Sequence, residues 1–315
     1  MTPSKSAAPS SDHWSSYWAR GALTSLPEDF RANYDGEIAA FWHNSFEALP
    51  SDAAILDVCT GNGALALLAA EFSKRHGRSF NVTALDAARI DPVAAVRNHP
   101  DLSGLVEIIR FVDRTPLEQF QHAPASLDLV MSQYGIEYCD QSIAAQRVAE
   151  WLRPAGQLVM LCHALSSDML RTMQGEQRDY QRLDELRLLR TLKAWLGKQL
   201  DSVELRRRFG RAGRELMPVY QRSRSPLLAF ALGMIEQVVQ MDESSLRARH
   251  DQLAAAHAQL QGGSDRLADM LRVNRMMNDP RWFEVYIEAG LELTDQGALQ
   301  YRGQHHVGHF FRFRR

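Results

Sequence analysis

Short apolar runs alternate with helix-like stretches through the first half of the chain. The runs are rich in Val, Ile and Leu, and they read AAILDV (53–58), FNVTALD (80–86), VEIIRFVD (106–113), LDLVMS (127–132) and QLVMLC (157–162). Helix-like stretches such as 64–75 lie between them. Near-continuous apolar strands that alternate with helices are typical of a parallel sheet covered on both faces. The pattern therefore predicts a doubly wound α/β core.

Helical patterns flank this core on both sides. Before it, apolar residues recur at spacings of three and four from Tyr34 to Leu49, which predicts an amphipathic helix. After it, residues 165–280 read as helix after helix, which predicts a large all-α insertion. Helix breaks are expected within it at Gly210–Gly213, Ser223–Pro226 and Gly262–Gly263.

Strands return only near the end of the chain. LELT (291–294) and ALQY (298–301) flank a predicted turn at 295–297, and HHVGHFFRFRR (305–315) follows. These runs predict an antiparallel edge on the parallel sheet. The chain thus divides into four parts: a tail and helical cap at 1–50, the first part of the core at 51–164, the helical insertion at 165–280, and a closing helix and strands at 281–315.

Composition and charge exclude several classes of protein. The 315 residues are 45% hydrophobic and 23% charged, which is ordinary for a soluble globular protein. The 36 Lys and Arg residues nearly balance the 38 Asp and Glu residues, so the net charge of −2 gives no general attraction to nucleic acid or to an anionic membrane. The most apolar stretch, Leu227–Ile235, is much shorter than the roughly 20 residues that a bilayer span needs.

The cysteines and the first residues bear on the compartment. Cys59, Cys139 and Cys162 are widely spaced and form no CxxC pair, so neither a disulfide framework nor a zinc site is indicated. The opening MTPSKSAAPSSD lacks the apolar run of a secretion signal and predicts a loose tail. Both observations favour a reducing, cytoplasmic setting.

Carboxylates and glycines gather at the ends of the predicted strands. The first strand runs into Asp57 and then into Gly61 and Gly63, the second ends at Asp86, and the third ends at Asp113. Ligands of open parallel sheets bind at the carboxyl ends of the strands. Glycines let a backbone approach such a ligand closely, and the acid that ends a second strand is well placed to bind ribose hydroxyls.

The charge of these side chains separates two kinds of nucleotide cofactor. The pattern Gly61-x-Gly63-x-x-Ala66 also fits the fingerprint of dinucleotide-binding proteins, although that match is short. Acids crowded around the glycine loop would repel a pyrophosphate. A ligand with an ammonium, a sulfonium and a ribose would be attracted to them instead. That description fits S-adenosylmethionine. The glycine fingerprint leaves an NAD(P)-dependent oxidoreductase as the alternative.

Five segments in order resemble the class I S-adenosylmethionine-dependent methyltransferases. They are ILDVCTGNGALALLAA, VTALD, RFVDRTPLEQF, SLDLVMSQYGIEY and VAEWLRPAGQLVML. The resemblance covers residues 53–164, with a looser match at 281–315. It implies a Rossmann-like sheet of seven strands with an antiparallel last strand. One departure is plain, because Cys59 stands where the pattern of that family has its first glycine.

The resemblance also implies which residues hold S-adenosylmethionine and its product S-adenosyl-L-homocysteine. Asp57, Gly61 and Gly63 would line the amino-acid end, and Asp86 would bind the ribose hydroxyls. Asp113 would bind the adenine amino group, with Arg114 beside it in the adenine-side loop. The floor beneath the methyl donor would be formed by Ser132, Gln133 and Tyr134. Two aromatic residues of the N-terminal segment, Trp18 and Tyr34, are candidates to cover the cofactor or stack on the substrate. The alternative for each single glycine is a tight turn, and for each Asp a helix N-cap.

Methyl transfer is an in-line displacement at an already activated methyl group, so a general base is optional. His163, just past the fifth strand, is the best-placed imidazole, and Glu137 and Tyr138 in the loop after the fourth strand come next. A strand-end residue bonded to the backbone is the alternative interpretation of His163. The histidines at 305, 306 and 309 suit an edge strand better than a metal site, so no metal is expected.

These observations together predict an enzyme that methylates an O, N or C nucleophile of a small or medium organic molecule. The helical insertion is expected to act as a lid over the strand ends, and a homodimer is left open. No nucleic-acid or membrane partner is expected. The alternatives are an RNA or protein methyltransferase of the same fold, the oxidoreductase, and a cofactor-binding protein without catalytic activity.

Overall fold

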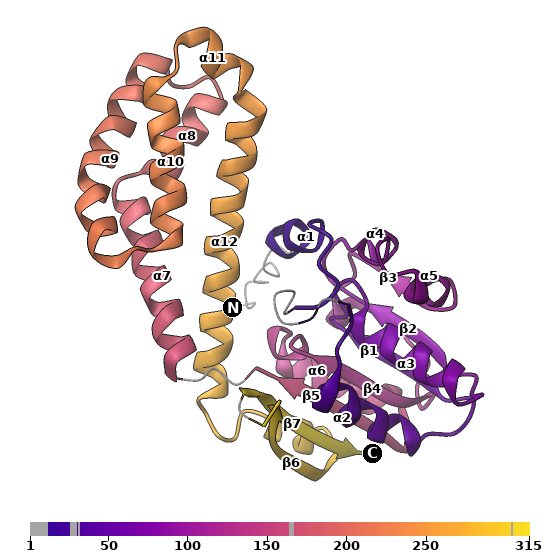
Figure 1. The fold of residues 1–315 in the computed structure, drawn as a ribbon. Helices are drawn as coiled ribbons and strands as arrows, with labels where there is room; N and C mark the ends of the chain where they lie inside the picture. Colours follow the sequence, from indigo (N-terminus) through magenta and orange to yellow (C-terminus); the bar gives the residue numbers. More distant parts are fainter. Residues whose placement is uncertain (1–11, 26–29, 31, 164–166, 304) are drawn as a thin grey trace, which may run out of the picture. The chain divides into compact units, whose positions relative to one another are not determined.

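The computed structural model describes residues 12–25, 30, 32–163, 167–303 and 305–315. The chain divides into two compact units (Figure 1), the first made of residues 1–166 and 272–315 and the second of residues 167–271. The loose tail expected at the start of the chain falls on residues 1–11, which lie outside the described residues.

Within the described residues, seven strands of the first unit form one sheet. They are β1 (Ala54–Val58), β2 (Asn81–Leu85), β3 (Arg110–Val112), β4 (Leu127–Gln133), β5 (Leu152–Cys162), β6 (Glu292–Tyr301) and β7 (His305–Arg314). Their order is β3-β2-β1-β4-β5-β7-β6. Pairing is parallel from β3 through β5, and β7 runs antiparallel to both β5 and β6. The predicted Rossmann-like sheet with an antiparallel last strand is therefore confirmed.

Helices cover both faces of this sheet (Figure 1). The helices of the first unit are α1 (Asp12–Trp18), α2 (Gly36–Glu47), α3 (Ala64–Arg75), α4 (Pro92–Ala95), α5 (Pro100–Val106), α6 (Gln141–Trp151) and α13 (Glu284–Glu288), with short 3-10 turns η1 (Leu117–Gln119) and η2 (Ile136–Tyr138). The amphipathic helix expected after Tyr34 is confirmed as α2, whose apolar stripe, including Ile38 and Phe46, is buried.

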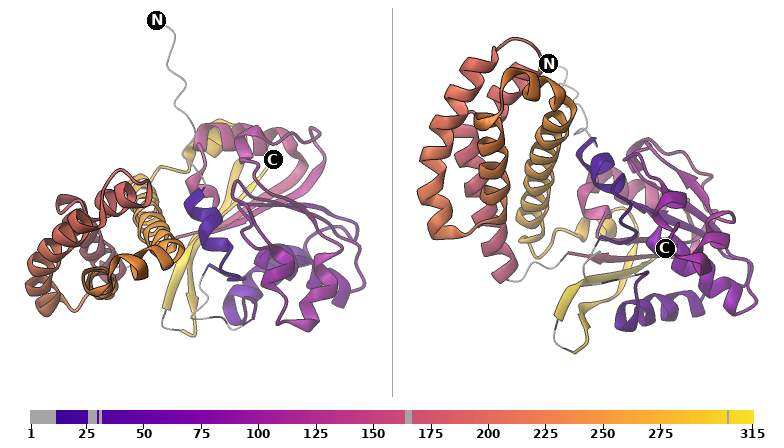
Figure 2. Two further views of the ribbon diagram at one scale, coloured as in Figure 1. Left: turned by 90° about the horizontal axis from the view of Figure 1, so that it is seen from above. Right: turned by 45° about the horizontal axis from the view of Figure 1, so that its top comes forward.

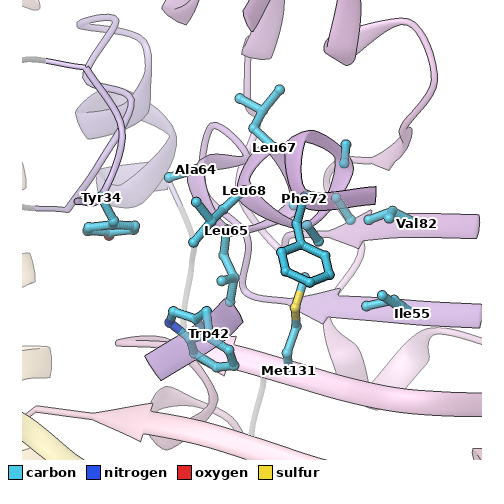
Figure 3. Close-up of a cluster of buried hydrophobic side chains, with 14 of the residues drawn as sticks. Tyr34, Trp42, Ile55, Ala64, Leu65, Leu67, Leu68, Phe72, Val82 and Met131 are labelled. Atoms are coloured by element: carbon cyan, nitrogen blue, oxygen red, sulfur yellow. The ribbon is translucent and has the colours of Figure 1, made fainter. Parts of the chain in front are cut away.

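Alternate residues of each strand face opposite sides of the sheet, and this alternation builds two cores. Ile55 and Met131 pack with α2 and α3 in one cluster, whereas their neighbours Leu56 and Val130 pack with α6 and α13 in the other. Figure 3 shows the first cluster, in which Trp42 of α2 lies close to Met131. The strand order reverses between β1 and β4, and this reversal is where open α/β sheets bind ligands.

The closing strands differ from the sequence prediction. The turn expected at 295–297 is wrong, because these residues lie inside the single strand β6. Gly297 pairs with Phe310 of β7, and a Cβ on this glycine would come within 3.0 Å of the Phe310 ring. The glycine therefore makes room for an aromatic ring across the sheet and does not turn the chain.

The second unit is helical in all its regular elements within the described residues. It contains α7 (Ser167–Glu185), α8 (Leu188–Leu196), α9 (Ser202–Ser223), α10 (Pro226–Gln240), α11 (Glu243–Ala248) and most of α12 (His250–Met277). Buried leucines and aromatic residues, such as Leu192, Leu205 and Phe209, form its own core. Figure 2 shows α9 and α10 side by side in this bundle. No helix in the described ranges is long and apolar enough to cross a bilayer.

Of the three helix breaks expected in this region, one is confirmed and two are wrong. Ser225 caps α10 by accepting a hydrogen bond from Leu228 N, and Pro226 begins that helix, so the break at 223–226 is present. Gly213 lies inside α9, where a Cβ would approach Ile235 of α10 to 3.0 Å. Gly263 lies inside α12, where a Cβ would meet the Tyr180 hydroxyl. Both glycines serve close helix packing.

Candidate functional site

The turn between β1 and α3 is built around the buried carboxylate of Asp57. Its Oδ2 accepts hydrogen bonds from Thr60 Oγ1 at 2.5 Å and from Ala66 N at 3.1 Å, so one side chain fixes both the turn and the start of the helix. Gly61 and Gly63 have φ values of 56° and 92°, in the left-handed region that glycine tolerates best. The sequence pattern around these glycines thus forms a tight loop at the carboxyl edge of the sheet.

Aromatic side chains lie directly over both glycines of this loop. A Cβ on Gly61 would come within 2.4 Å of Trp18 Cζ2, and one on Gly63 within 2.6 Å of Phe111 Cε1. Trp18 is a candidate to cover the cofactor or stack on the substrate, and the structure places its ring over Gly61. Sequence reasoning missed Phe111. Its signal was its place on β3, which lies two strands from β1 and the glycine loop in the sheet.

Asn62 ties the N-terminal segment to the glycine loop, and sequence reasoning missed this residue as well. Its side chain is 0% exposed. Its Nδ2 donates to Trp18 O at 3.0 Å and to Ala22 O at 2.7 Å, and its Oδ1 accepts from Asp91 N at 2.9 Å. A polar residue between two glycines was the available signal. Asn62 therefore positions Trp18 over the loop.

Asp86 at the end of β2 lies beside the same loop. Its Oδ2 accepts from Gly61 N and its Oδ1 from Ala88 N, both at 2.7 Å. Burial raises the pKa of Asp86 to about 6. Burial likewise raises the pKa of Asp57 to about 7, and the charge of Asp86 acts in the same direction. Two buried carboxylates at neighbouring strand ends thus hold their protons more tightly than ordinary aspartates.

Asp113 and Arg114 lie at the same sheet edge but at the surface. Arg114 Nε lies 3.6 Å from Asp113 Oδ2, so the two side chains form an ion pair. The Asp113 side chain is 46% exposed and the Arg114 side chain is 67% exposed. The loop that carries them is bonded to the loop of Asp86, because Thr115 N donates to Asp86 O at 2.9 Å. The structure therefore brings the adenine-side candidates next to Asp86 without burying them.

The end of β4 supplies the three candidates for the floor of the site. Ser132 Oγ donates to Val58 O at 2.9 Å and accepts from Ile136 N at 3.0 Å, so it joins two loops. Tyr134 donates its hydroxyl to the backbone of β7. Gln133 Oε1 accepts from Trp42 Nε1 at 2.6 Å, while its buried Nε2 makes no hydrogen bond within the described part of the chain. Gln133 alone of the three keeps an unused donor.

Tyr34, the second aromatic candidate of the N-terminal segment, is buried near these residues. Its hydroxyl lies 3.1 Å from Ser25 Oγ. Burial raises the pKa of Tyr34 to about 12, and the hydrogen bonds from Ser25 only partly offset this. Its ring packs edge-to-face on Phe30 at 5.2 Å and belongs to the buried cluster drawn in Figure 3, so the structure gives it a packing role beside the site.

The three candidates for catalysis come together past the ends of β4 and β5. Glu137 Oε1 accepts from His163 N at 3.0 Å and lies 2.7 Å from His163 Nδ1. Glu137 is 0% exposed, and its Oε2 has no hydrogen-bond partner among the described residues. The rings of Tyr134 and Tyr138 lie 4.7 and 5.9 Å from the His163 ring.

This contact orients the imidazole, because Nδ1 of His163 faces Glu137 and Nε2 lies on the other side of the ring. An ionised Glu137 accepts from Nδ1, and in a neutral ring with that tautomer Nε2 carries the lone pair. The His163 side chain is 24% exposed, which leaves Nε2 within reach of a ligand. Edge-to-face packing of Trp14 on Tyr138, at 5.3 Å, adds a residue of α1 to the same cluster. The arrangement can accept a proton at one oriented nitrogen.

Comparison with known proteins gives no relative by sequence. No protein-family model matches the chain, and no curated protein matches it. Among solved structures, it is similar to a Haemonchus contortus phosphoethanolamine N-methyltransferase 2 in complex with S-adenosyl-L-methionine, with 15% identity, 91% of this chain and 54% of that chain covered, and a TM-score of 0.38.

Two further structures match smaller parts. An S-adenosylmethionine-dependent methyltransferase from Mesorhizobium loti has 23% identity over 41% of this chain and 55% of that one, with a TM-score of 0.31. A geranyl diphosphate C-methyltransferase from Streptomyces coelicolor A3(2) has 11% identity over 44% and 52%, with a TM-score of 0.35. The chain thus spans just over half the length of each of these structures. The case for a function rests on the site itself.

Proposed function

We propose that this protein is an S-adenosylmethionine-dependent methyltransferase that acts on a small or medium organic acceptor. One observation carries the proposal: the buried carboxylates of Asp57 and Asp86 flank a loop of left-handed glycines at the carboxyl edge of the sheet. Such a cradle favours a cofactor that is cationic and bears a ribose. It disfavours a pyrophosphate, because buried carboxylates repel phosphate charge.

The hydrogen-bonding capacity of the side chains at this edge supports the choice of this cofactor. A carboxylate can accept about four hydrogen bonds, and Asp86 uses one acceptor site on each oxygen for Gly61 N and Ala88 N. The remaining sites are free to accept ribose hydroxyls. The unused Nε2 donor of Gln133 suits the carboxylate at the amino-acid end, and the ring of Trp18 suits a covering role.

The proposed chemistry needs little from the protein beyond positioning and one proton acceptor. Once bound, S-adenosylmethionine supplies an activated methyl group on its sulfonium. His163 Nε2 takes the proton of the attacking nucleophile, while Glu137 holds the ring by Nδ1. Tyr138, with Trp14 packed on it, covers one side of the imidazole and limits the access of water to it. In this scheme Glu137 is a positioning residue.

The proposal also covers the class of methyl acceptor and the cellular compartment. A net charge of −2 suits a small organic acceptor better than a nucleic acid. The free cysteines suit the cytoplasm. The roles expected of the N-terminal cap and of the helical segment 165–280 as a lid stay predictions, as does a homodimer.

Ligand binding tests the proposal directly. S-adenosylmethionine and S-adenosylhomocysteine are expected to raise the melting temperature, because a ligand at about 100 times its Kd stabilises the fold by roughly 2.7 kcal/mol. NADH at the same concentration is expected to leave it unchanged. Label from methyl-tritiated cofactor should then appear in the small-molecule fraction of a cell extract. Stabilisation by NADH alone would identify an oxidoreductase, and label only in macromolecules would identify an RNA or protein methyltransferase.

Cofactor affinity is expected to rise as the pH rises through 6 and 7. Burial holds the pKa of Asp86 at about 6 and that of Asp57 at about 7, so both are largely neutral below these values. A bound cation favours the ionised carboxylates, lowers both pKa values and releases protons. Calorimetry near pH 6 in two buffers of different ionisation enthalpy measures this release.

In the free protein, the same two groups make the stability of the fold fall as the pH rises. This trend is opposite to that of the cofactor affinity and serves as the control. The native state of the free protein binds more protons than its unfolded state between about pH 4 and 7, so these groups make the free energy of unfolding fall as the pH rises. Proton uptake on cofactor binding, or an affinity that is flat across this range, would contradict the assignment of the two carboxylates.

A further inference from the structure

Two cysteines from different loops meet at the edge of the candidate site. Cys59 lies in the glycine loop after β1, and Cys139 directly follows η2, 80 residues later. Their sulfur atoms are 3.6 Å apart, and both side chains are partly exposed. The third cysteine, Cys162, is 0% exposed. The sulfur atoms of Cys59 and Cys139 are therefore in van der Waals contact.

The surrounding backbone holds this pair in place. Cys59 has a φ of 58°, a left-handed conformation that is uncommon for a residue with a side chain. A Cβ on Gly135 would lie 2.3 Å from Cys59 Cβ, so Gly135 leaves the room that this cysteine needs. Ser132 Oγ binds Val58 O in one loop and Ile136 N in the other. Both loops are therefore clamped on the two sides of the sulfur contact.

We propose that Cys59 and Cys139 are an oxidation site that forms a reversible disulfide with hydrogen peroxide as the oxidant. One thiolate attacks the peroxide and becomes a sulfenic acid, and the leaving hydroxide takes up a proton to become water. The second sulfur then attacks the sulfenic sulfur and a second water leaves. In total, two thiols and one peroxide give one disulfide and two waters. Two thiols of an external reductant restore the pair.

The acidity of the pair sets how fast it reacts. The hydrogen bond with Cys139 and burial raise the pKa of the Cys59 thiol, and the charges of Asp86 and Glu137 act in the same direction. Only the thiolate attacks the oxidant, so oxidation is slow at neutral pH and accelerates as the pH rises. Proximity of the second thiol then favours the disulfide over further oxidation of the first sulfur.

Bond formation pulls Cys59 and its loop toward Cys139, against the hydrogen bonds of Ser132. A disulfide bond is about 2.05 Å long, so the two sulfur atoms approach each other by about 1.5 Å from their present 3.6 Å. The loop that carries Cys59 also carries Asp57 and Gly61. If the proposed function is correct, methyl transfer falls by about 100-fold on oxidation, because a misplacement of about 1 Å costs that much.

Intact-mass measurement of the full chain after peroxide treatment tests the disulfide without any assay of activity. The wild-type protein is expected to lose the mass of two hydrogen atoms, and to regain it with a thiol reductant. Cys59→Ser and Cys139→Ser should show no such loss, while Cys162→Ser, the matched control, should behave as the wild type. If the buried Cys162→Ser variant does not fold, differential alkylation and peptide mapping of the wild type identify the linked residues.

Three outcomes overturn the proposal: no mass loss at any pH, stepwise addition of oxygen atoms at Cys59 or Cys139, or a linkage to Cys162. A disulfide that forms and leaves cofactor binding unchanged overturns only the coupling to the site. Absence of methyl transfer in the reduced protein would contradict the proposed function and leave the disulfide result standing.

Discussion

Asp86→Asn is expected to weaken S-adenosylmethionine binding by roughly 100-fold or more while the protein stays folded. A hydrogen bond to a charged group contributes about 1.5–3 kcal/mol, and each 1.4 kcal/mol is about tenfold in affinity. Two ribose hydroxyls bound to a carboxylate therefore account for two or more orders of magnitude. Titration calorimetry of the wild type and the variant measures the difference.

The choice of asparagine follows from the hydrogen bonds that Asp86 already makes. Its two oxygens accept from Gly61 N and Ala88 N. Alanine would leave both N–H groups without their partner, at about 1–3 kcal/mol each if they stay buried, and would disturb the loop. Asparagine keeps one acceptor and the size of the side chain. A melting curve close to that of the wild type then shows that lost affinity reflects lost cofactor contacts.

Asp113→Ala, at the exposed adenine-side candidate, is the comparison for this experiment. Asp113 ends the next strand along the edge, but its side chain is 46% exposed and pairs with Arg114, which is 67% exposed. Its removal is expected to change affinity by a few-fold at most, because interactions of exposed charged groups contribute only about 0.2–1 kcal/mol. Equal losses in both variants would show a general charge effect. No loss in Asp86→Asn would remove the ribose assignment.

The sequence predicts this part of the site well because its signals are local. A short apolar run identifies a buried strand, and the residue after it must lie at the carboxyl edge. Asp57, Gly61 and Asp86 follow directly from this rule. The hydrogen bond from Asn62 to the backbone carbonyl of Trp18 does not follow from this rule, because it joins residues 44 positions apart. No period in the sequence encodes such a contact.

Glycines explain most of the errors in the predicted fold. Glycine marks a turn when the backbone needs a positive φ, and it also lies inside helices or strands where a neighbour comes too close for a Cβ. Gly61 and Gly63 are of the first kind. Gly213, Gly263 and Gly297 are of the second kind, with Ile235, Tyr180 and Phe310 as the respective neighbours. The partner of each lies on another element, so the sequence alone did not separate the two cases.

The pairing of Glu137 with His163 was likewise not predicted, although both residues were candidates. The two lie 26 positions apart on the ends of adjacent parallel strands, and only the register of β4 against β5 brings them together. The sequence also left open whether His163 is a base or a strand-end residue bonded to the backbone. Its ring is now oriented by a buried carboxylate, which favours the base.

His163→Ala is expected to lower kcat by about 100- to 10,000-fold, the range of general acid–base catalysis, with the Kd of S-adenosylmethionine changed little. Glu137→Gln keeps an acceptor for His163 N but removes the charge that holds Nδ1, so a smaller loss of kcat is expected. The half-buried His122, which precedes β4 at the opposite end of the strand and bonds Ser126, is the matched control for substitution by alanine.

Chemical rescue separates a base from a structural residue. A base takes the proton of the nucleophile in the transition state, so a small external base can stand in for a missing side chain. In His163→Ala, added imidazole should therefore restore part of the lost rate. A variant with low kcat that added imidazole does not restore would mean that His163 only supports the loop. In that case the oriented imidazole is a strand-end anchor, and the acceptor must lose its proton to solvent.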